Sequence, residues 1–350
     1  MTKPTLVQIP SGYKAGTLYS VVPNTGDGDF TFARNSEATR INGDGLIETV
    51  GTNVPRLDYT DSQCPQLLLE PARTNLITYS DDFTNAIWGK TNYSVDSNAT
   101  ISPDGTQNAD RIYNNGGGDG YVSIIEGATE EVISFYVKKS NTRYVLVGST
   151  LGAAFFDLDN GNYTGNFVNV NPEGLKHKKL DNGWFRLSYK NPSDSVNNFL
   201  LRASTTDSVI TQSIGEGMYV WGAQREAGAY PTSYIPTSGA TATRLADASS
   251  ITGLKSKGFI GASAGSIGGE FYAEELFRDA GGDSFVFGIS GGDAVRIRRA
   301  SASSAVRMYF VIEQSGVVIE LQITTQDNNK WLFSWDSSGW FLTVNGAVVA

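Results

Sequence analysis

The sequence has little of the side-chain chemistry on which most enzymes and metal proteins depend. Its 350 residues include one cysteine, Cys64, and one histidine, His177. No intrachain disulfide can form, and a zinc site or a Ser/His/Asp catalytic group would have to use these single residues. We predict a buried structural thiol at Cys64 and a surface position for His177, which lies among lysines with no nucleophile motif beside it. These absences favour a protein that is not an enzyme.

Long apolar segments and dense basic charge are also scarce. No stretch approaches the ~18 apolar residues of a membrane span, and the N-terminus lacks the apolar core of a signal peptide. We therefore expect neither signal-peptide secretion nor membrane insertion. The formal net charge is -9, and the only dense basic run is Lys176–Lys179, so nucleic acid is not an expected partner.

What the sequence does contain is typical of an all-β protein. It has 39 glycines, 11% aromatic residues and only 18% charged residues, which suits short strands joined by tight turns rather than a disordered chain. Carboxylate pairs such as Asp157 and Asp159 lie beside Asn-Gly, so we predict turn formers rather than the paired acids of a glycosidase. We predict an all-β fold of about two or three domains.

Turn signals and period-two alternation divide the chain into four parts. The first part has too few apolar residues for a core of its own, so we expect an extended module covered by the next domain or by sister chains. The second has the strand spacing of a β-sandwich, the third is an Ala/Ser/Thr/Gly-rich linker, and the fourth starts a second sandwich. That sandwich is short, so we expect the polypeptide to continue. The predicted boundaries are 1–75, 76–239, 240–265 and 266–350.

Several motifs between residues 30 and 237 resemble parts of bacteriophage particles. Phe30–Arg40, Asn53–Tyr59 and Leu68–Leu76 look like the N-terminal part of phage head-spike or tail-fibre proteins. Asp181–Arg186 and Tyr219–Glu226 are similar to jelly-roll carbohydrate-binding modules attached to such fibres. Under this resemblance the middle domain is a jelly roll, and the last part resembles a concanavalin-like sandwich.

The resemblance implies a function. The chain would be a structural subunit of a virion head fibre, tail fibre or spike, assembled in the host cytoplasm and contributing to adhesion to a host-surface glycan. Its expected partners are that glycan and other virion proteins of the capsid or tail, and the expected assembly is a homotrimer. The alternatives are an accessory sugar-binding region of a glycan-degrading enzyme whose catalytic part lies outside this chain, and a purely structural decoration without ligand.

Tyrosines in turn-rich segments are the candidates for sugar binding. A Tyr ring offers an apolar face and a hydroxyl, and Asn and Asp give directional hydrogen bonds to sugar hydroxyls. A jelly roll can bind glycan on its concave sheet or at a loop edge, and we predict the loop edge. The alternative is that these rings pack on their own loops or on sister chains. The predicted ligand-binding residues are Tyr93, Tyr121, Tyr163, Asp119 and Asn162.

No residue pattern requires a cofactor, and an EF-hand motif is absent. Jelly-roll modules of the class that the chain resembles often carry one structural calcium, however. Carboxylates near the two ends of the predicted domain could meet in an antiparallel sandwich. The predicted metal ligands are Asp81, Asp82 and Glu226.

Overall fold

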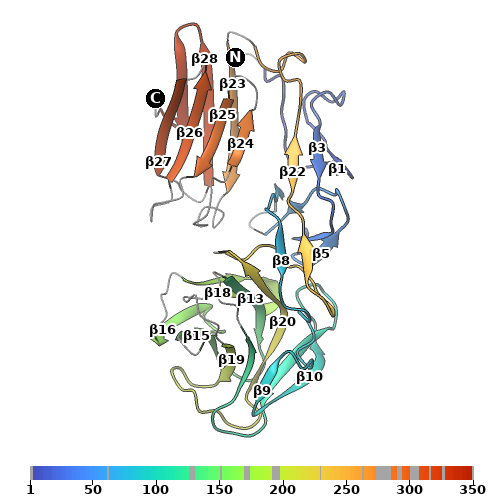
Figure 1. Cartoon of the computed structure of the whole chain (residues 1–350), viewed down its shortest axis with the longest axis vertical. Helices are drawn as coiled ribbons and strands as arrows, with labels where there is room; N and C mark the ends of the chain where they lie inside the picture. Colours follow the sequence, from blue (N-terminus) through green and yellow to red (C-terminus); the bar gives the residue numbers. More distant parts are fainter. Residues whose placement is uncertain are drawn as a thin grey trace. The chain divides into compact units, whose positions relative to one another are not determined.

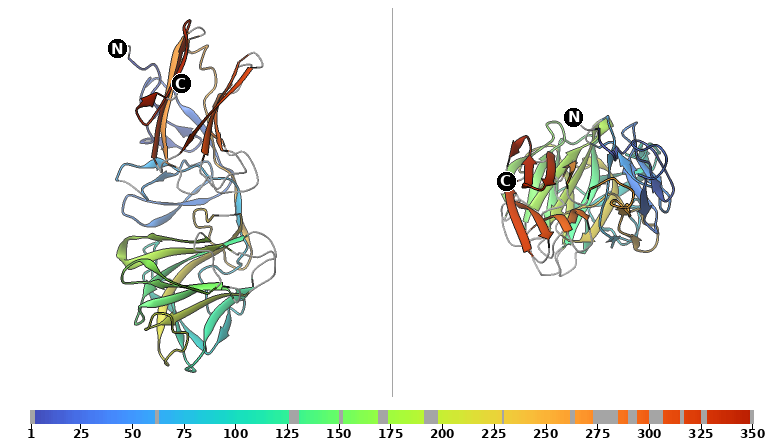
Figure 2. Two further views of the ribbon diagram at one scale, coloured as in Figure 1. Left: turned by 90° about the vertical axis from the view of Figure 1, so that its left-hand side faces the viewer. Right: turned by 90° about the horizontal axis from the view of Figure 1, so that it is seen from above.

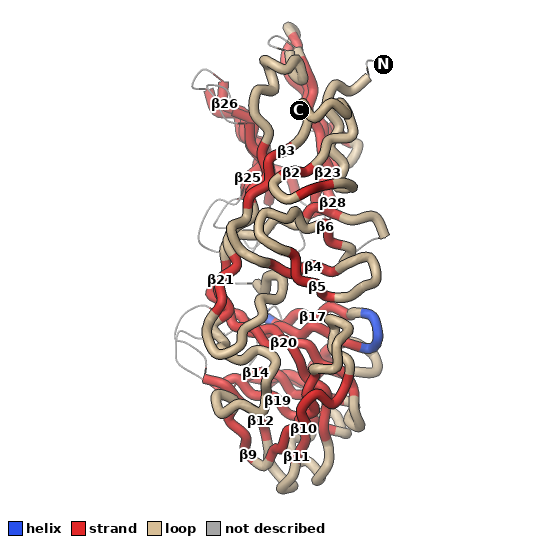
Figure 3. The backbone as a smooth tube through the Cα atoms, turned by 90° about the vertical axis from the view of Figure 1, so that its right-hand side faces the viewer, coloured by secondary structure: helices blue, strands red, loops and turns tan. Residues whose placement is uncertain are grey.

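The fold is all-β, as predicted. In the described residues the computed structural model consists mainly of antiparallel strands and turns, and Asp181–Gly183 form a short 3-10 helix (Figure 3). The described residues are 3–60, 63–125, 131–149, 152–168, 174–190, 198–228, 230–261, 264–272, 285–289, 294–299, 307–314, 317–324 and 328–348.

The chain forms two compact units whose limits differ from the predicted domain boundaries. One unit, here called the sandwich unit, comprises Gln8–Ser20 and Asp29–Ser250. The other, the C-terminal unit, comprises Met1–Val7, Val21–Gly28 and Ile251–Ala350. Most of the predicted N-terminal module therefore belongs to the same compact body as the jelly roll.

The jelly roll consists of two six-stranded antiparallel sheets, named here after a central strand (Figure 1). The chain passes repeatedly from one sheet to the other, as from β12 to β13 and on to β14, and such crossing is typical of a jelly roll. The β13 sheet has the order β10 (Tyr93–Thr100), β11 (Ala109–Asn114), β20 (Gly217–Ala227), β13 (Glu131–Lys139), β18 (Trp184–Lys190) and β17 (Leu175–Lys179). The β14 sheet has the order β16 (Asn162–Val168), β15 (Gly152–Asp157), β14 (Tyr144–Ser149), β19 (Asn198–Ser204), β12 (Tyr121–Ile125) and β9 (Gly89–Thr91).

The core lies between these two sheets and follows the two-residue period of the strands. Phe185, Leu187 and Tyr189 of β18 are buried in it, as their alternation predicts. They meet inward-facing residues of the β14 sheet, including Phe156 and Phe199. Burial of such rings is the main stabilising term, at about 25 cal/mol per Å² of apolar surface.

A second cluster covers the outer face of the β13 sheet. Trp184, the neighbour of Phe185 on the opposite face of β18, is 1% exposed there. Ile47 of β5 (Ile47–Val50) and Tyr234, which follows β20, pack against it. The N-terminal segment therefore packs against the next domain, one of the two partners predicted from the sequence; the other was a sister chain. The members of this cluster are Ile47, Ala109, Tyr136, Trp184, Trp221 and Tyr234.

Short strands organise the N-terminal segment. β4 (Ala38–Ile41) pairs with β5 as a hairpin, and β6 (Leu57–Asp58) pairs with β7 (Gln66–Leu67). Just before β7, Cys64 is exposed, so the prediction of a buried thiol is wrong. This two-stranded ladder is too small to enclose the side chain. β1 (Tyr13–Lys14), β2 (Thr17–Leu18) and β3 (Phe30–Ala33) form a small sheet with β22 (Ala248–Ser250).

The first part of the predicted linker is therefore structured. β21 (Ala242–Arg244) pairs with β8 (Arg73–Asn75), and β22 pairs with β3. Small and hydroxylated residues suggested a linker at 240–265, but those at 240–250 also suit edge strands whose partners come from far away in the sequence.

A buried network of five charged side chains joins these distant segments. Arg56 contacts both Glu70, at 2.6 Å, and Asp247. Arg34 reaches the other oxygen of Asp247 at 2.9 Å, and Arg244 contacts Glu70. Each arginine is at most 1% exposed. Burial acts to raise the pKa of Glu70, but Arg56 and Arg244 outweigh it and hold that pKa well below its ordinary range.

The C-terminal unit contains two four-stranded antiparallel sheets (Figure 2). Its last hairpin turns at Asn345 and Gly346, with φ of 49° and 83°, as the Asn-Gly pair predicts. One sheet has the order β23 (Gly265–Tyr272), β28 (Asn328–Asp336), β29 (Gly339–Val344) and β30 (Ala347–Val348). The other has the order β24 (Phe285–Ile289), β25 (Ala294–Arg299), β26 (Arg307–Gln314) and β27 (Val317–Thr324).

Candidate functional site

The outer face of the β14 sheet carries the most distinctive polar and aromatic group outside the core. Leu146 of β14 stands opposite Arg202 of β19 on one side and Phe155 of β15 on the other. Because cross-strand partners point to the same side, these three side chains share the face turned away from the core. Leu146 and Phe155 belong to a small cluster separate from the main core, with Tyr144 packed against it.

Two arginines on this face lie over tyrosine rings and also contact carboxylates. The Arg202 guanidinium lies 5.1 Å from the centroid of the Tyr121 ring and forms an ion pair with Asp119. The Arg143 guanidinium lies 5.1 Å from the ring of Tyr144. Both tyrosines are half-buried, and their strands are separated by one strand, β19. The same combination of ring, cation and carboxylate therefore occurs twice on one sheet face.

Arg143 and Asp157 form the second ion pair in a defined geometry. Arg143 donates from Nε and Nη2 to the two oxygens of Asp157, at 3.0 and 2.7 Å. These hydrogen bonds lower the pKa of Asp157, which also accepts from the backbone N–H groups of Asp159 and Asn160. As predicted for the Asp157/Asp159 pair, the carboxylate organises the turn after β15.

Two loops border this face at one end. The Gly-rich loop before β12 is tied to the loop before β20 by paired backbone hydrogen bonds between Gly118 and Gln212, of 3.0 and 2.9 Å. The side chains of Asn114 and Gln212 bond to each other beneath the loops. Thr164 of β16 donates to Asp207 in the loop after β19. These contacts hold the rim in one arrangement, which reduces the entropy lost when a ligand binds.

The five predicted ligand residues do not form one loop-edge site. Tyr93 begins strand β10, is 5% exposed, and accepts a hydrogen bond from the backbone N–H of Ala203, so its prediction as a ring platform is wrong. Tyr163 also points inward: its ring is 5.0 Å from Phe156, and its hydroxyl donates to a backbone carbonyl. The turn-rich sequence around each ring suggested a loop, but both rings fill the sandwich interior instead.

Three of the predicted residues do belong to the outer face or its rim. Tyr121 lies under Arg202, and Asp119 pairs with that arginine. Asn162, on β16, is exposed and lies opposite Asp157 of β15. Arg202 and Tyr144 were missed, although alternation in their strands predicts an outward position once Leu201 and Val145 are assigned to the core.

The predicted metal ligands are not gathered into a site. Glu226 is fully buried and accepts the backbone N–H of Thr232 at 2.9 Å, while burial raises its pKa. Asp81 accepts the hydroxyl of Tyr234, and burial raises the pKa of Asp81 to about 6. In the described part of the chain, no three His, Cys, Asp or Glu side chains are arranged to hold a metal. Asp82 accepts the backbone N–H of Thr84 at 3.0 Å, so these carboxylates satisfy local donors instead.

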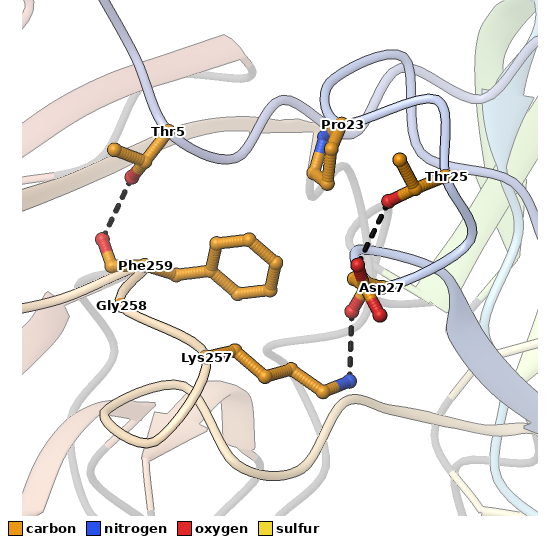
Figure 4. A pocket seen from close by; sticks show the side chains of 7 residues that line it. All are labelled: Thr5, Pro23, Thr25, Asp27, Lys257, Gly258 and Phe259. Atoms are coloured by element: carbon orange, nitrogen blue, oxygen red, sulfur yellow. Dashed lines mark hydrogen bonds between the residues drawn. The ribbon is translucent and has the colours of Figure 1, made fainter.

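The C-terminal unit has an open hollow of about 530 Å³ beside the Phe259 ring (Figure 4). Lys257 donates to the backbone carbonyl of Asp27 at 2.7 Å, and Thr25 donates to the Asp27 carboxylate at 2.9 Å. None of the predicted ligand residues lines this hollow. The lining residues are Thr5, Pro23, Thr25, Asp27, Lys257, Gly258 and Phe259.

Comparison of the sequence with protein-family models and with curated proteins gives no match. Within the described residues, no helix has the length and apolar character needed to cross a membrane.

Proposed function

We propose that the chain is a structural subunit of a bacteriophage head or tail fibre or spike, and that its jelly roll adheres to a host-surface glycan. The glycan lies on the outer face of the β14 sheet. The observation that carries this proposal is the pair of Tyr–Arg–carboxylate groups on that face, built from Tyr121, Arg202 and Asp119 and, two strands away, from Tyr144 and Arg143 with Asp157.

The chemistry of this face suits a sugar chain. Tyrosine rings offer apolar surface to the C–H groups of a pyranose, and the arginines and carboxylates supply donors and acceptors for its hydroxyls. From β12 to β16 the face covers four inter-strand spacings, about 19 Å. This length suits an extended oligosaccharide better than a single sugar ring.

The β14 sheet is also the better placed of the two sheets. The outer face of the β13 sheet is occupied by Ile47 and Tyr234, which pack on Trp184 and Trp221. Glycan binding on the β13 sheet would require removal of this cluster. The β14 sheet instead keeps half-buried side chains of Tyr121, Tyr144 and Arg202 at its surface.

The virion part of the proposal is supported by the motifs between residues 30 and 76. Their charged residues Arg34, Arg56 and Glu70 are buried together and tie the N-terminal segment to residues that follow the jelly roll. A rigid connection between an N-terminal segment and a binding domain suits a structural subunit of a particle.

A single site is expected to bind its glycan weakly, whereas a particle that displays many copies of the chain is expected to bind strongly. Two rings at about 1–2 kcal/mol each, with a few hydrogen bonds, give about 4–5 kcal/mol, or a dissociation constant near millimolar. Multivalent display on a particle would convert such weak contacts into firm adhesion.

Binding of the full chain to an array of bacterial oligosaccharides tests the proposal. Tyr121→Ala and Tyr144→Ala should each weaken binding of the recognised glycan by about tenfold, with little change in the melting temperature. Tyr113→Ala is the matched control, because Arg111 lies 4.8 Å over the Tyr113 ring but on the β13 sheet. Equal losses in all three variants, or no glycan bound by the unmodified chain, would contradict the proposal.

A further inference from the structure

We infer that the glycan recognised by the outer face of the β14 sheet is neutral, without carboxylate or sulfate groups. This inference rests on the proposed function and specifies the ligand class. Three features of the face support a neutral ligand: its net negative charge, the hydrogen bonds that its arginines already make, and the donors and acceptors that can still bind sugar hydroxyls.

Carboxylates outnumber cations on this face and its rim. Lys139 and Arg143 are both close to Asp159, at 2.6 and 3.7 Å, and Arg143 also bonds Asp157. Counted over the described residues of the face and rim, three cations stand against five carboxylates, a net charge of -2. An acidic sugar would be repelled by this field, and the chain as a whole is also acidic, with a formal charge of -9. The cations are Lys139, Arg143 and Arg202; the carboxylates are Asp119, Asp157, Asp159, Asp207 and Glu216.

The arginines are also poorly placed to receive a new anion. The Nε and Nη2 donors of Arg143, the pair that binds a carboxylate in parallel, are both engaged by Asp157. The Nη1 group of Arg202 contacts Asp119, and its Nε is shielded from solvent. To bind through two parallel N–H donors of one arginine, an anionic sugar would have to displace Asp119 or Asp157, and would leave that carboxylate without its partner.

A neutral sugar requires no such displacement. Carboxylate oxygens of Asp119 and Asp157 accept hydrogen bonds from sugar hydroxyls, and the remaining N–H groups of the paired arginines donate to them. Adjacent hydroxyls on a pyranose offer the same alternation of donor and acceptor that each arginine–carboxylate pair presents. The ion pairs therefore stay intact, and each pair can bind two adjacent hydroxyls of one sugar ring.

The test uses the full chain on an array that carries neutral oligosaccharides and their uronic-acid or sulfated counterparts. The unmodified chain should bind at least one neutral member about tenfold more tightly than its acidic counterpart. This binding should change little between about 0.05 and about 0.5 M salt. Asp119→Asn should reduce the ratio between the affinities for the neutral glycan and its acidic counterpart, because it removes one negative charge from the rim.

Asp96→Asn is the matched control, since Asp96 pairs with Arg111 at 3.5 Å on the β13 sheet, and it should leave the ratio unchanged. Preferential binding of an acidic member, with an affinity that falls steeply as salt is added, would overturn the inference while the proposed adhesive role stands. Failure of the unmodified chain to bind either kind would overturn both.

Discussion

Replacing Glu70 by glutamine should destabilise the sandwich unit far more than the loss of an ordinary ion pair. Glu70 is 9% exposed and contacts Arg56 and Arg244. Glutamine keeps the size of the side chain but leaves the three buried arginines of the network with only one carboxylate, Asp247. Removal of one partner from a buried ion pair costs about 3–5 kcal/mol, so we expect a loss of this size in the free energy of unfolding.

Arg40 and Glu48 provide an internal control. Their N···O distance is 2.6 Å, the same as between Arg56 and Glu70, but Glu48 is 35% exposed. Glu48→Gln should cost about 0–1 kcal/mol, because water reaches Glu48 and already screens its attraction to Arg40. Urea unfolding of the full chain at neutral pH, followed by tryptophan fluorescence, measures both losses. Equal losses in the two variants would refute the reasoning.

The pH dependence supplies a second check on the same variant. The pKa of Glu70 is lower in the folded chain than its ordinary 4.5. The stability that its charge contributes is therefore present above about pH 4.5 and is lost as pH falls through the folded-state pKa. The difference between the unmodified chain and Glu70→Gln should shrink over that acid range.

Three further predictions concern single side chains. Tyr93→Ala should cost about 3–5 kcal/mol of unfolding free energy in urea denaturation, because it empties a core position; stability near that of the unmodified chain would show that the ring is not core. The pKa of Asp81 is raised from 3.8 to about 6, so stability should fall as pH rises through that window, and Asp81→Asn should flatten the melting temperature measured across it. Burial and the neighbouring Lys176 lower the pKa of His177, so stability should decline as pH falls below 6.5, and a melting curve that shows the same decline in His177→Gln would contradict this assignment.

The all-β fold was predictable because strand alternation is local. In β18, Phe185 and Leu187 face the core while Trp184 faces the opposite side, as a two-residue period requires. The Asn345-Gly346 turn is equally local, since positive φ at both positions is a property of those two residues.

The candidate site could be predicted only in part, because it depends on which strands become neighbours. Tyr121 was identified from its residue type, but nothing near it in the sequence indicates that Arg202 lies over its ring. Tyr93 and Tyr163 show the opposite error: glycine and asparagine around them suggested loops, whereas each residue lies on a strand of an antiparallel pair and turns its ring inward. The five-residue ion network was missed for the same reason, since Arg34 and Asp247 are 213 positions apart.

That separation has a consequence for the order of events during synthesis. The N-terminal segment that contains Arg34, Arg56 and Glu70 emerges from the ribosome long before Arg244 and Asp247. Its charged side chains therefore stay hydrated until about 180 further residues have been translated, a delay of roughly 10–40 s at 5–20 residues per second. The contacts that complete it have high contact order, and closure of so long a loop is slow. Nascent chains stalled before Arg244 should therefore be cut readily by protease within residues 29–75, and protection should arrive in one step once Asp247 has cleared the exit tunnel.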